Sequence, residues 1–536
     1  MLKSILKIVC LSLSEAAFSQ QPVSRVWVAD NGDGTYRNPV LQADYSDPDA
    51  IRVGDDYYLI SSSFNHVPGL PILHSKDLVN WELTGHALKK LPSPYYDSVR
   101  HGGGVWAPSI RYHNNEFYIY YPDPDFGIYL IKAKNITGPW SEPVLVQAGK
   151  GLIDPCPLWD DDGKVYLVHA YAGSRAGIKS IIVVKELNKE GTQVISDGVL
   201  VYDGHEKDPT IEGPKFYKRN GYYYIFAPAG GVSTGWQTVL RSKKVYGPYE
   251  RKVVMDQGKS AVNGPHQGAW VDTKTGEHWF LHFQDKEAYG RVVHLQPMKW
   301  MDDWPVIGED KDGDGKGEPV LTYKKPNTGK SCPVNTPAET DEFNSTTPGL
   351  QWQWQANPKE GWAYATAAGS LRMFSVLETD SASLWNTPNI LAQKLPAEEF
   401  TATVKLAFKP KYKYERFGLV VFGSDYAYIS LMKTDDGVYI FSADNTNADK
   451  GRTEQDGALF SVKSETIWLR LRMEKNGVYH FSYSEDDIRY TTIAKAEVAK
   501  PGRWVGAKMG LFCLRTNKTN DAGFADVDWF RIERLQ

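Results

Sequence analysis

The sequence predicts an all-β protein in which an N-terminal five-bladed β-propeller is followed by a C-terminal β-sandwich of the jelly-roll kind. A hairpin-like unit that opens on a proline recurs five times between residues 37 and 307. Beyond residue 341, apolar and polar residues alternate with the period of two that is typical of half-buried strands. Aromatic residues make up 13% of the 536-residue chain, a share that suits β-structure. The length itself indicates more than one domain.

Residues 1–19 read as an export signal. Basic Lys3 and Lys7 accompany the mostly apolar run ILKIVCLSLS, and Ala17 and Ser19 are the small residues expected at positions −3 and −1 of a cut before Gln20. The apolar run is too short to span a bilayer, and no later stretch is long and apolar enough to do so. We therefore expect a cleaved signal peptide, and a periplasmic or extracellular location in a bacterium.

Residues 20–321 are expected to form the propeller. Each repeated unit has a proline, an apolar stretch, a polar turn and then aromatic residues, and two of the turns are the hairpin-forming pairs Asp162-Gly163 and Asn220-Gly221. Units that recur about every 50 residues fit four-stranded blades. The prolines that open the five units are Pro48, Pro108, Pro155, Pro214 and Pro265.

Residues 322–340 are rich in Pro, Thr, Asn and Lys and read as a linker. Segments such as FTATVKLAFKP and GFADVDWFRIERL then alternate apolar and polar residues, and no long helical pattern interrupts them. Residues 341–536 are therefore expected to form the antiparallel sandwich.

Three acidic residues lie at the entrances of the predicted blades. Asp47 and Asp154 directly precede their prolines, and Glu212 lies one residue further away. Because the first strand of every blade lines the axis of a propeller, the entrances converge at one end of it. Buried carboxylates without partners are costly, so a purely structural role explains the cluster poorly. Carboxyl groups gathered at a concave site are candidates for acid–base chemistry.

Around these acids the sequence resembles glycoside hydrolase family 43. The matching stretches include NPVLQADYSDPDAIRVGDDYYLISSSF, HSKDLVNW, GGGVWAPSI, LIDPCPLWDDDGKVYLV, IEGPKFYK and GRVVHLQPM, in the order found in the family. The resemblance implies inverting hydrolysis, in which one carboxylate activates water and one carboxylic acid protonates the leaving oxygen across a gap of roughly 6.5–9.5 Å.

The resemblance assigns a role to each acid. Asp47 matches the general base, Glu212 the general acid, and Asp154 the residue that modulates the pKa of Glu212 and orients it. A negatively charged Asp154 would raise the pKa of Glu212 and keep it protonated.

Other acids near these positions are the alternatives to the three assigned ones. Asp44 and Asp49 are expected to be solvated or strand-capping, and Asp160, Asp161 and Asp162 are expected to form a solvated hairpin tip. Glu206 and Asp208 read as part of a loop.

Four further residues carry over from the resemblance as substrate-binding candidates. Phe64 and Trp106 match aromatic walls of the sugar pocket, with blade packing as the alternative. Arg291 matches an arginine that holds sugar oxygens, with a salt bridge to a catalytic acid as the alternative. His266 matches a histidine near the axis that approaches a bound calcium or a water cluster, with an ordinary buried histidine as the alternative. No cofactor is required for the reaction, and a structural calcium is left open.

Two other patterns carry no function. The Asp310–Pro319 segment begins like a calcium-binding loop but has Leu321 where the loop needs Glu, so it reads as a surface turn. Cys156, Cys332 and Cys513 are too few and too widely spread for a disulfide framework or a metal site.

The expected substrate is an arabinose- or xylose-containing oligosaccharide or polysaccharide. YSDPDAIRV looks closer to the arabinofuranosidase branch of the family, so exo-acting release of terminal α-L-arabinofuranosyl residues from hemicellulose is the first expectation and β-D-xylosidase activity the alternative. A formal net charge of −4 gives no indication of nucleic acid or an anionic membrane as a partner. The oligomeric state cannot be read from the sequence.

Three other functions remain as alternatives. A non-catalytic sugar-binding propeller would not need all three acids. A retaining enzyme of the invertase type would need signatures that the chain lacks, and so would a sialidase. The C-terminal region resembles the concanavalin-like domain attached to many family members, which implies a structural role with a contribution to the rim of the pocket.

Overall fold

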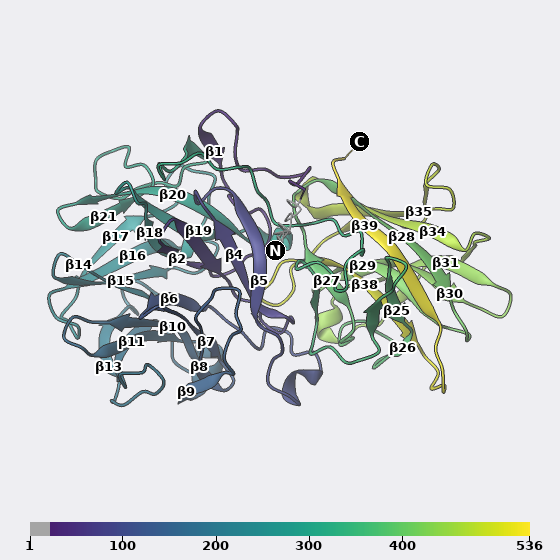
Figure 1. Cartoon of the computed structure of the whole chain (residues 1–536), viewed down its shortest axis with the longest axis horizontal. Helices are drawn as coiled ribbons and strands as arrows, with labels where there is room; N and C mark the ends of the chain where they lie inside the picture. The colour runs from purple at the N-terminus through teal and green to yellow at the C-terminus, as the bar shows by residue number, and fades with distance from the viewer. Residues whose placement is uncertain (1–21, 536) are drawn as a thin grey trace, which may run out of the picture.

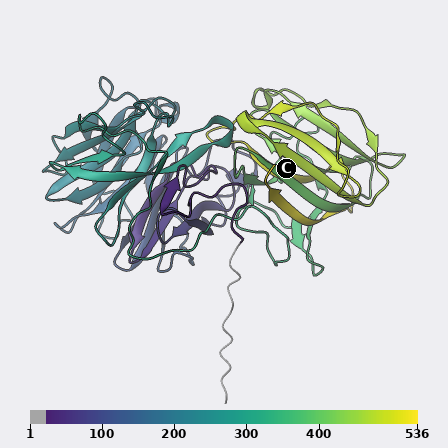
Figure 2. The same cartoon turned by 90° about the horizontal axis from the view of Figure 1, so that it is seen from above.

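The computed structural model describes residues 22–535, which form two β-rich bodies side by side (Figures 1 and 2). The predicted signal peptide lies outside these residues. Within them, no helix has both the length and the apolar character needed to cross a membrane.

The N-terminal body is a five-bladed propeller, as predicted, and each blade is an antiparallel sheet of four consecutive strands. The first strands are β2 (Asp49–Val53), β6 (Ser109–His113), β10 (Leu152–Trp159), β14 (Lys215–Arg219) and β18 (His266–Asp272). The second strands are β3 (Asp56–Ile60), β7 (Glu116–Asp123), β11 (Val165–Tyr171), β15 (Tyr222–Ala229) and β19 (His278–Asp285). The third strands are β4 (Gly69–Ser75), β8 (Gly127–Ala133), β12 (Ile181–Leu187), β16 (Trp236–Ser242) and β20 (Arg291–Met301). The outer strands are β5 (Trp81–Leu88), β9 (Val144–Ala148), β13 (Val199–Asp203), β17 (Glu250–Met255) and β21 (Trp304–Ile307).

The first strands surround the axis, because β18, β2, β6, β10 and β14 contact one another in that order. Helical structure in the described chain is confined to one short α-helix, α1 (Gly173–Ala176), and to single 3₁₀ turns at Tyr95–Asp97, Glu287–Tyr289, Ala448–Lys450 and Lys475–Gly477.

The residue before the blade proline has left-handed backbone geometry in four of the five blades. The φ angles are 55° at Asp47, 56° at Asp154, 61° at Gly213 and 48° at Gly264. In β10 this residue coincides with a register shift between Ile153 and Cys156, a β-bulge that redirects the strand. Blades 4 and 5 place glycine at this strained position, which explains why the acid of blade 4, Glu212, lies one residue earlier.

A two-stranded ribbon joins the start and the end of the propeller. Strand β1 (Thr35–Arg37) pairs antiparallel with β22 (Thr322–Lys324). Next to it, the buried Asn38 amide donates hydrogen bonds of 2.8 Å to the carbonyls of Leu295 and Val320. Blade 5 and the segment after it are thereby fixed to the chain before blade 1.

The C-terminal body is the predicted sandwich of two sheets, antiparallel except for one two-residue strand. One sheet contains β23 (Gln353–Trp354), β27 (Leu391–Lys394), β38 (Lys508–Arg515), β29 (Arg416–Phe422), β30 (Tyr426–Lys433), β31 (Val438–Asn445) and β32 (Gln455–Asp456), with β26 (Val376–Leu377) and β33 (Phe460–Ser461) attached. The other contains β24 (Ala363–Ala365), β25 (Leu371–Phe374), β39 (Phe524–Glu533), β28 (Phe400–Lys409), β34 (Thr466–Met473), β35 (Val478–Ser484) and β36 (Thr491–Thr492), with β37 (Glu497–Val498) attached. Alternate side chains such as Leu419 of β29 and Leu469 of β34 share the core between the sheets.

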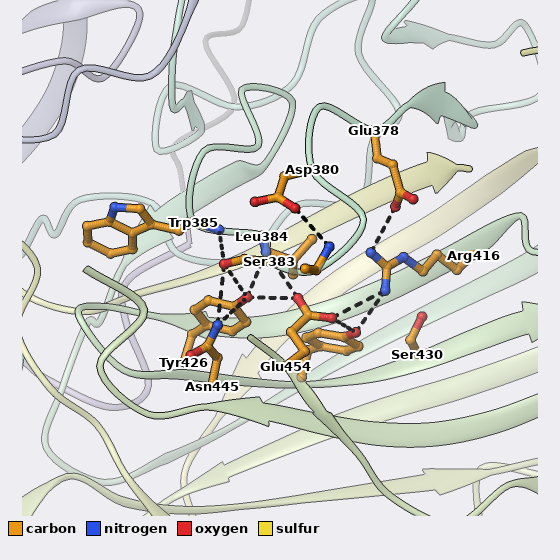
Figure 3. A network of polar contacts seen from close by, with 12 residues as sticks. Glu378, Asp380, Ser383, Leu384, Trp385, Arg416, Tyr426, Ser430, Asn445 and Glu454 are labelled. Atoms are coloured by element: carbon orange, nitrogen blue, oxygen red, sulfur yellow. Dashed lines mark hydrogen bonds and ion pairs between the residues drawn. The ribbon is translucent and has the colours of Figure 1, made fainter. Parts of the chain in front are cut away.

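A buried polar network attaches the segment that contains Ser383 and Leu384 to the outer face of the first sheet (Figure 3). Glu454 accepts hydrogen bonds from the Tyr426 and Tyr428 hydroxyls at 2.7 Å and from the Leu384 backbone N–H at 3.0 Å. The Arg416 guanidinium lies 3.5 Å from the same carboxylate. Strand β29 is therefore buried on both faces, which explains why all its residues after Arg416 are apolar.

The two bodies are joined by backbone hydrogen bonds as well as by the linker. Val67 of the propeller forms a β-bridge with Trp354 of the sandwich. The Ala507 N–H donates to the carbonyl of Ala288 at 2.7 Å. These bonds fix the sandwich against one side of the propeller.

Candidate active site

Asp47 is buried and its carboxylate is held by three partners. The Arg291 guanidinium lies 2.8 Å from one carboxylate oxygen. The other oxygen accepts hydrogen bonds from the Ser62 hydroxyl at 2.5 Å and the Ser46 hydroxyl at 2.9 Å. Asp47 is 4% exposed, so it has little freedom to rotate away from these donors. Arg291 thus forms the salt bridge that the sequence left open as its alternative role.

Asp154 and Glu212 are held next to each other at the entrances of blades 3 and 4. The Asp154 carboxylate accepts a 2.7 Å hydrogen bond from the backbone N–H of Gly213, the residue that follows Glu212 in the chain. The imidazole Nε2 of His266 lies 3.0 Å from a Glu212 carboxylate oxygen. Glu212 is therefore fixed through its backbone by Asp154 and through its side chain by His266.

Burial raises the pKa of Asp154 to about 8, and the nearby Glu212 and Asp47 carboxylates add to this rise. The sequence led us to expect a charged Asp154 at neutral pH. Burial works against that charge, because Asp154 is 2% exposed and the hydrogen bond from Gly213 is the one that its carboxylate accepts within residues 22–535. The Glu212 side chain is 26% exposed, so it is the member of the pair that reaches the solvent.

His266 is fully buried, and its second ring nitrogen, Nδ1, has no hydrogen-bond partner among residues 22–535. An unpartnered nitrogen fits a water or an ion at this end of the axis, but His266 belongs to no set of three metal-ligating side chains in the described chain. The one such set found there is Asp310, Asp312 and Asp314, within 4.8 Å of one another in an exposed turn. The Asp310 carboxylate already accepts hydrogen bonds from the backbone N–H groups of Gly313 and Gly315. Calcium at His266 stays a prediction.

Phe64 and Trp106 lie against each other with ring centroids 6.2 Å apart at 62°. Phe64 is almost completely buried and has a φ of 51°, and its backbone is paired with Val105. Trp106 is half-buried and donates its indole N–H to the carbonyl of Gly102 at 2.9 Å. The two rings form an aromatic wall with structural contacts of its own, and that this wall belongs to a sugar pocket stays a prediction.

A tryptophan from the C-terminal domain completes this aromatic wall. Trp504 meets Trp106 edge-on, with centroids 5.8 Å apart at 64°. A groove of about 510 Å³ runs between the two domains beside it. The groove is lined by Val232, Ser233, Asn263, Asp285, Arg291 and Trp504, among others. Its wall thus combines the arginine that holds Asp47 with a side chain from the second domain.

Three acids that we expected to be solvated or loop residues are buried in ion pairs. Asp49 is completely buried beside the Arg111 guanidinium, at 2.7 Å. Asp208 lies 2.6 Å from Arg251. Asp160 is buried next to Lys218, so only its neighbours in the hairpin tip face the solvent. Each of these three acids therefore has a basic partner that accounts for its burial.

Asp44 also differs from the expectation of a solvated or capping acid. Its two carboxylate oxygens accept 2.9 Å hydrogen bonds from the backbone N–H groups of Arg291 and Gly506. Asp44 therefore links the catalytic region of the propeller to the loop that carries Trp504. The sequence had suggested Asp44 only as an alternative to Asp47, and it had not suggested Trp504. The one sequence signal for Trp504 was its place between two glycines in KPGRWVG.

Comparison with known proteins adds the family. The sequence model described as "Glycosyl hydrolases family 43" matches residues 36–305, and the one described as "Beta xylosidase C-terminal Concanavalin A-like domain" matches residues 340–533. A protein of Xylanibacter ruminicola that is provisionally named a β-xylosidase is 40% identical over 91% of this chain and 87% of its own. The non-reducing end α-L-arabinofuranosidase BoGH43B of Bacteroides ovatus is 30% identical over 94% of this chain and 95% of its own.

A solved structure gives the same result for the whole chain. The crystal structure of the family-43 protein BlXynB from Bacillus licheniformis superposes with a TM-score of 0.81 at 28% identity, covering 94% of this chain and all of that one. The match extends over both domains and the acids lie where the blades converge. The chain is therefore a member of glycoside hydrolase family 43 with a β-xylosidase-type concanavalin A-like C-terminal domain.

Proposed function

We propose that this glycoside hydrolase is an exo-acting, inverting enzyme that removes terminal β-D-xylosyl residues from xylo-oligosaccharides, with α-L-arabinofuranosyl residues as its second substrate class. The single observation that supports the chemistry is the grouping of Asp47, Asp154 and Glu212 beside Arg291 and His266. The sequence motifs had favoured the arabinofuranoside. The 40% identical relative with a β-xylosidase name and the β-xylosidase-type second domain move the preference to the xyloside.

In the proposed reaction Asp47 acts as the general base. Its carboxylate takes a proton from a water molecule whose oxygen attacks the anomeric carbon of the terminal sugar. The ion pair with Arg291 and the two serine hydroxyls hold the carboxylate in one orientation, which lowers the entropic cost of that step.

Glu212 acts as the general acid. As the bond between the anomeric carbon and the leaving oxygen breaks, Glu212 gives its proton to that oxygen. Asp154 holds the backbone next to Glu212, and His266 keeps the Glu212 carboxyl directed at one position. Proton loss from Asp47 and proton uptake by Glu212 from solvent then restore the enzyme.

The arabinofuranosidase reading remains the second candidate because the Bacteroides ovatus relative of that name covers 94% of this chain. Xylopyranose and arabinofuranose present similar hydroxyls to a single-sugar pocket. The decisive test is the rate on 4-nitrophenyl β-D-xylopyranoside and on 4-nitrophenyl α-L-arabinofuranoside, measured side by side for the wild type and Asp47→Ala.

We expect the xyloside to have the higher kcat/KM and both activities to be lost in Asp47→Ala. A preference for the arabinoside would change the proposed substrate and leave the proposed mechanism unchanged. Proton NMR of the first product tests inversion: release of α-xylose from the β-xyloside is expected, and β-xylose as the first product would contradict the assignment of Asp47 as a base.

A further inference from the structure

Two buried lysines of the sandwich face each other at the seam between the domains. Lys394 of β27 and Lys508 of β38 are directly opposite in the antiparallel register. Lys508 is 5% exposed, and Lys394 is partly buried with its ammonium 5.0 Å from the centroid of the Tyr45 ring. Like charges directly opposite on neighbouring strands are destabilising. Within residues 22–535, neither ammonium group has an ion pair or a hydrogen bond to a side chain or to the backbone.

The propeller adds basic groups to this seam rather than acids. His66 is 5% exposed, and burial together with Lys508 and Lys394 lowers its pKa. Burial and the same two lysines lower the pKa of His86 to about 3. His101, which stacks on a tryptophan of the sandwich, is a further basic neighbour of His66.

Asp44 is the one carboxylate of the described chain whose charge acts on both lysines. Both oxygens of Asp44 already accept hydrogen bonds, one from the backbone N–H of Arg291 and one from that of Gly506. No salt bridge within 4.0 Å joins it to Lys394 or Lys508 in residues 22–535. Burying two ammonium groups beside one distant carboxylate is costly unless something else compensates the charge.

Small cavities lie beside both lysines. One, of about 60 Å³, is lined by Lys394, His86 and Gln42, and a second, of about 20 Å³, is lined by Lys508 and His66. Gln42 is 3% exposed, and neither its amide nitrogen nor its amide oxygen has a partner. A cavity of the smaller size has room for one or two particles as large as water. That space excludes sugars, nucleotides and other polyatomic ligands.

We propose that the seam between the two domains binds a small monoatomic anion, chloride under ordinary conditions, in the cavity beside Lys508, with Lys394 directly opposite as the second positive charge. The anion supplies the negative charge that the side chains do not. Since a bound anion favours the charged lysines, binding is accompanied by proton uptake and strengthens as the pH falls.

The site is separate from the catalytic acids but lies next to the bond from Asp44 to Gly506. An anion there stabilises the contact between the domains, and so the position of the loop that carries Trp504. Its expected effect is on the stability of the whole chain, which makes its test independent of the substrate and of the assignment of the catalytic residues.

The first test is thermal unfolding of the full-length protein at pH 6 in sodium chloride and in sodium gluconate of equal ionic strength, because gluconate is too large for the cavities. We expect the Tm to be about 2 °C higher in chloride and in bromide than in gluconate. This difference should vanish in Lys508→Met and persist in Lys409→Met, which removes an exposed lysine from the same sandwich. If the difference in Tm between chloride and gluconate were as large in Lys508→Met as in the wild type, the effect would be a general action of the salt and the proposal would be wrong.

The second test does not depend on a variant that folds. Crystals of the wild-type protein grown or soaked in sodium bromide are measured at the bromine absorption edge. The expected result is an anomalous difference peak in the cavity beside Lys508, within hydrogen-bonding distance of its ammonium group. An ordered seam without such a peak would mean that the two lysines are buried as neutral amines, and the proposal would be wrong.

Discussion

The indole ring of Trp504 meets that of Trp106 edge-on, with centroids 5.8 Å apart, although the two residues belong to different domains. The backbone N–H of Gly506, two residues on, is bound by Asp44 of the propeller. The sandwich therefore contributes a side chain to the groove that Arg291 also lines, and its position there is held by a buried hydrogen bond. The predictions below begin with this contact.

Trp504→Ala is expected to weaken substrate binding more than catalysis. Losing an aromatic face costs about 1 kcal/mol, so KM should rise by about fivefold while kcat changes little. Steady-state kinetics on xylobiose and on 4-nitrophenyl xyloside measure this split. Lys500→Ala, at an exposed position in the same loop, is the control and should leave KM unchanged. A fall in kcat with constant KM would instead assign Trp504 an interaction made only in the transition state, and unchanged kcat and KM would show that Trp504 does not contact the substrate.

Asp47→Asn and Glu212→Gln should differ in their dependence on the leaving group. Loss of the base is expected to lower kcat by about 10²- to 10⁴-fold for every substrate. Loss of the acid should be severe for xylobiose and mild for 2,4-dinitrophenyl xyloside, whose leaving group needs no proton. Asp161→Asn, at the exposed hairpin tip, controls for the loss of a carboxylate. The same leaving-group dependence in both variants would contradict the assigned roles.

Asp154→Asn should change how stability varies with pH. The pKa of Asp154 is about 8 in the folded protein and ordinarily 3.8, so the folded state binds this proton more tightly. The resulting stabilisation is present in full below pH 4 and is lost as the pH rises toward 8, because the unfolded chain gives up the proton first. The Tm of the wild type minus that of Asp154→Asn should therefore fall between pH 5 and pH 8.

Asp55→Asn provides the control for that pH series. Hydrogen bonds from Lys330 and Lys274 lower the pKa of Asp55 to about 2, so this group has finished titrating well below pH 5. Its difference in Tm from the wild type should be constant from pH 5 to pH 8. A constant difference for Asp154→Asn as well would mean that Asp154 is ionised throughout this range.

Asp44→Asn is expected to loosen the contact between the domains. An asparagine side chain has one acceptor oxygen, so either Arg291 or Gly506 loses the partner of its buried N–H, at a cost of about 1–3 kcal/mol. The Tm should fall, and amide hydrogen exchange should become faster in residues 499–507. Unchanged exchange in that segment would show that other contacts, such as the bond from Ala507 to Ala288, are sufficient to hold it.

The propeller could be predicted from the sequence because its signal is local. Each blade begins with a proline and turns at short hairpins, so the pattern lies within about 50 residues. The same prolines identified Asp47 and Asp154, whose left-handed backbone directly precedes them. Glu212 was found one residue earlier because Gly213 occupies the strained position, and the resemblance to the family was needed to choose it over Asp208.

What could not be predicted depends on contacts between residues far apart in the chain. Asp49 was expected to be solvated because its partner Arg111 lies in the next blade. The wall formed by Trp106 and Trp504 joins residues almost 400 positions apart, and no local pattern indicates which loop of the sandwich faces the groove. The raised pKa of Asp154 depends on burial, which the residue types alone do not determine.

The ribbon formed by β1 and β22 brings the two ends of the propeller ring together. Because the ring is already closed there by backbone pairing, the point at which the chain enters the ring is not fixed by geometry, while the cyclic order of the blades is. A circular permutant with new termini at the exposed tip Asp161–Gly163, and with the sandwich moved to a matching linker, would retain every contact around the axis. The catalytic cluster belongs to the closed ring, and its assembly is independent of where the chain begins.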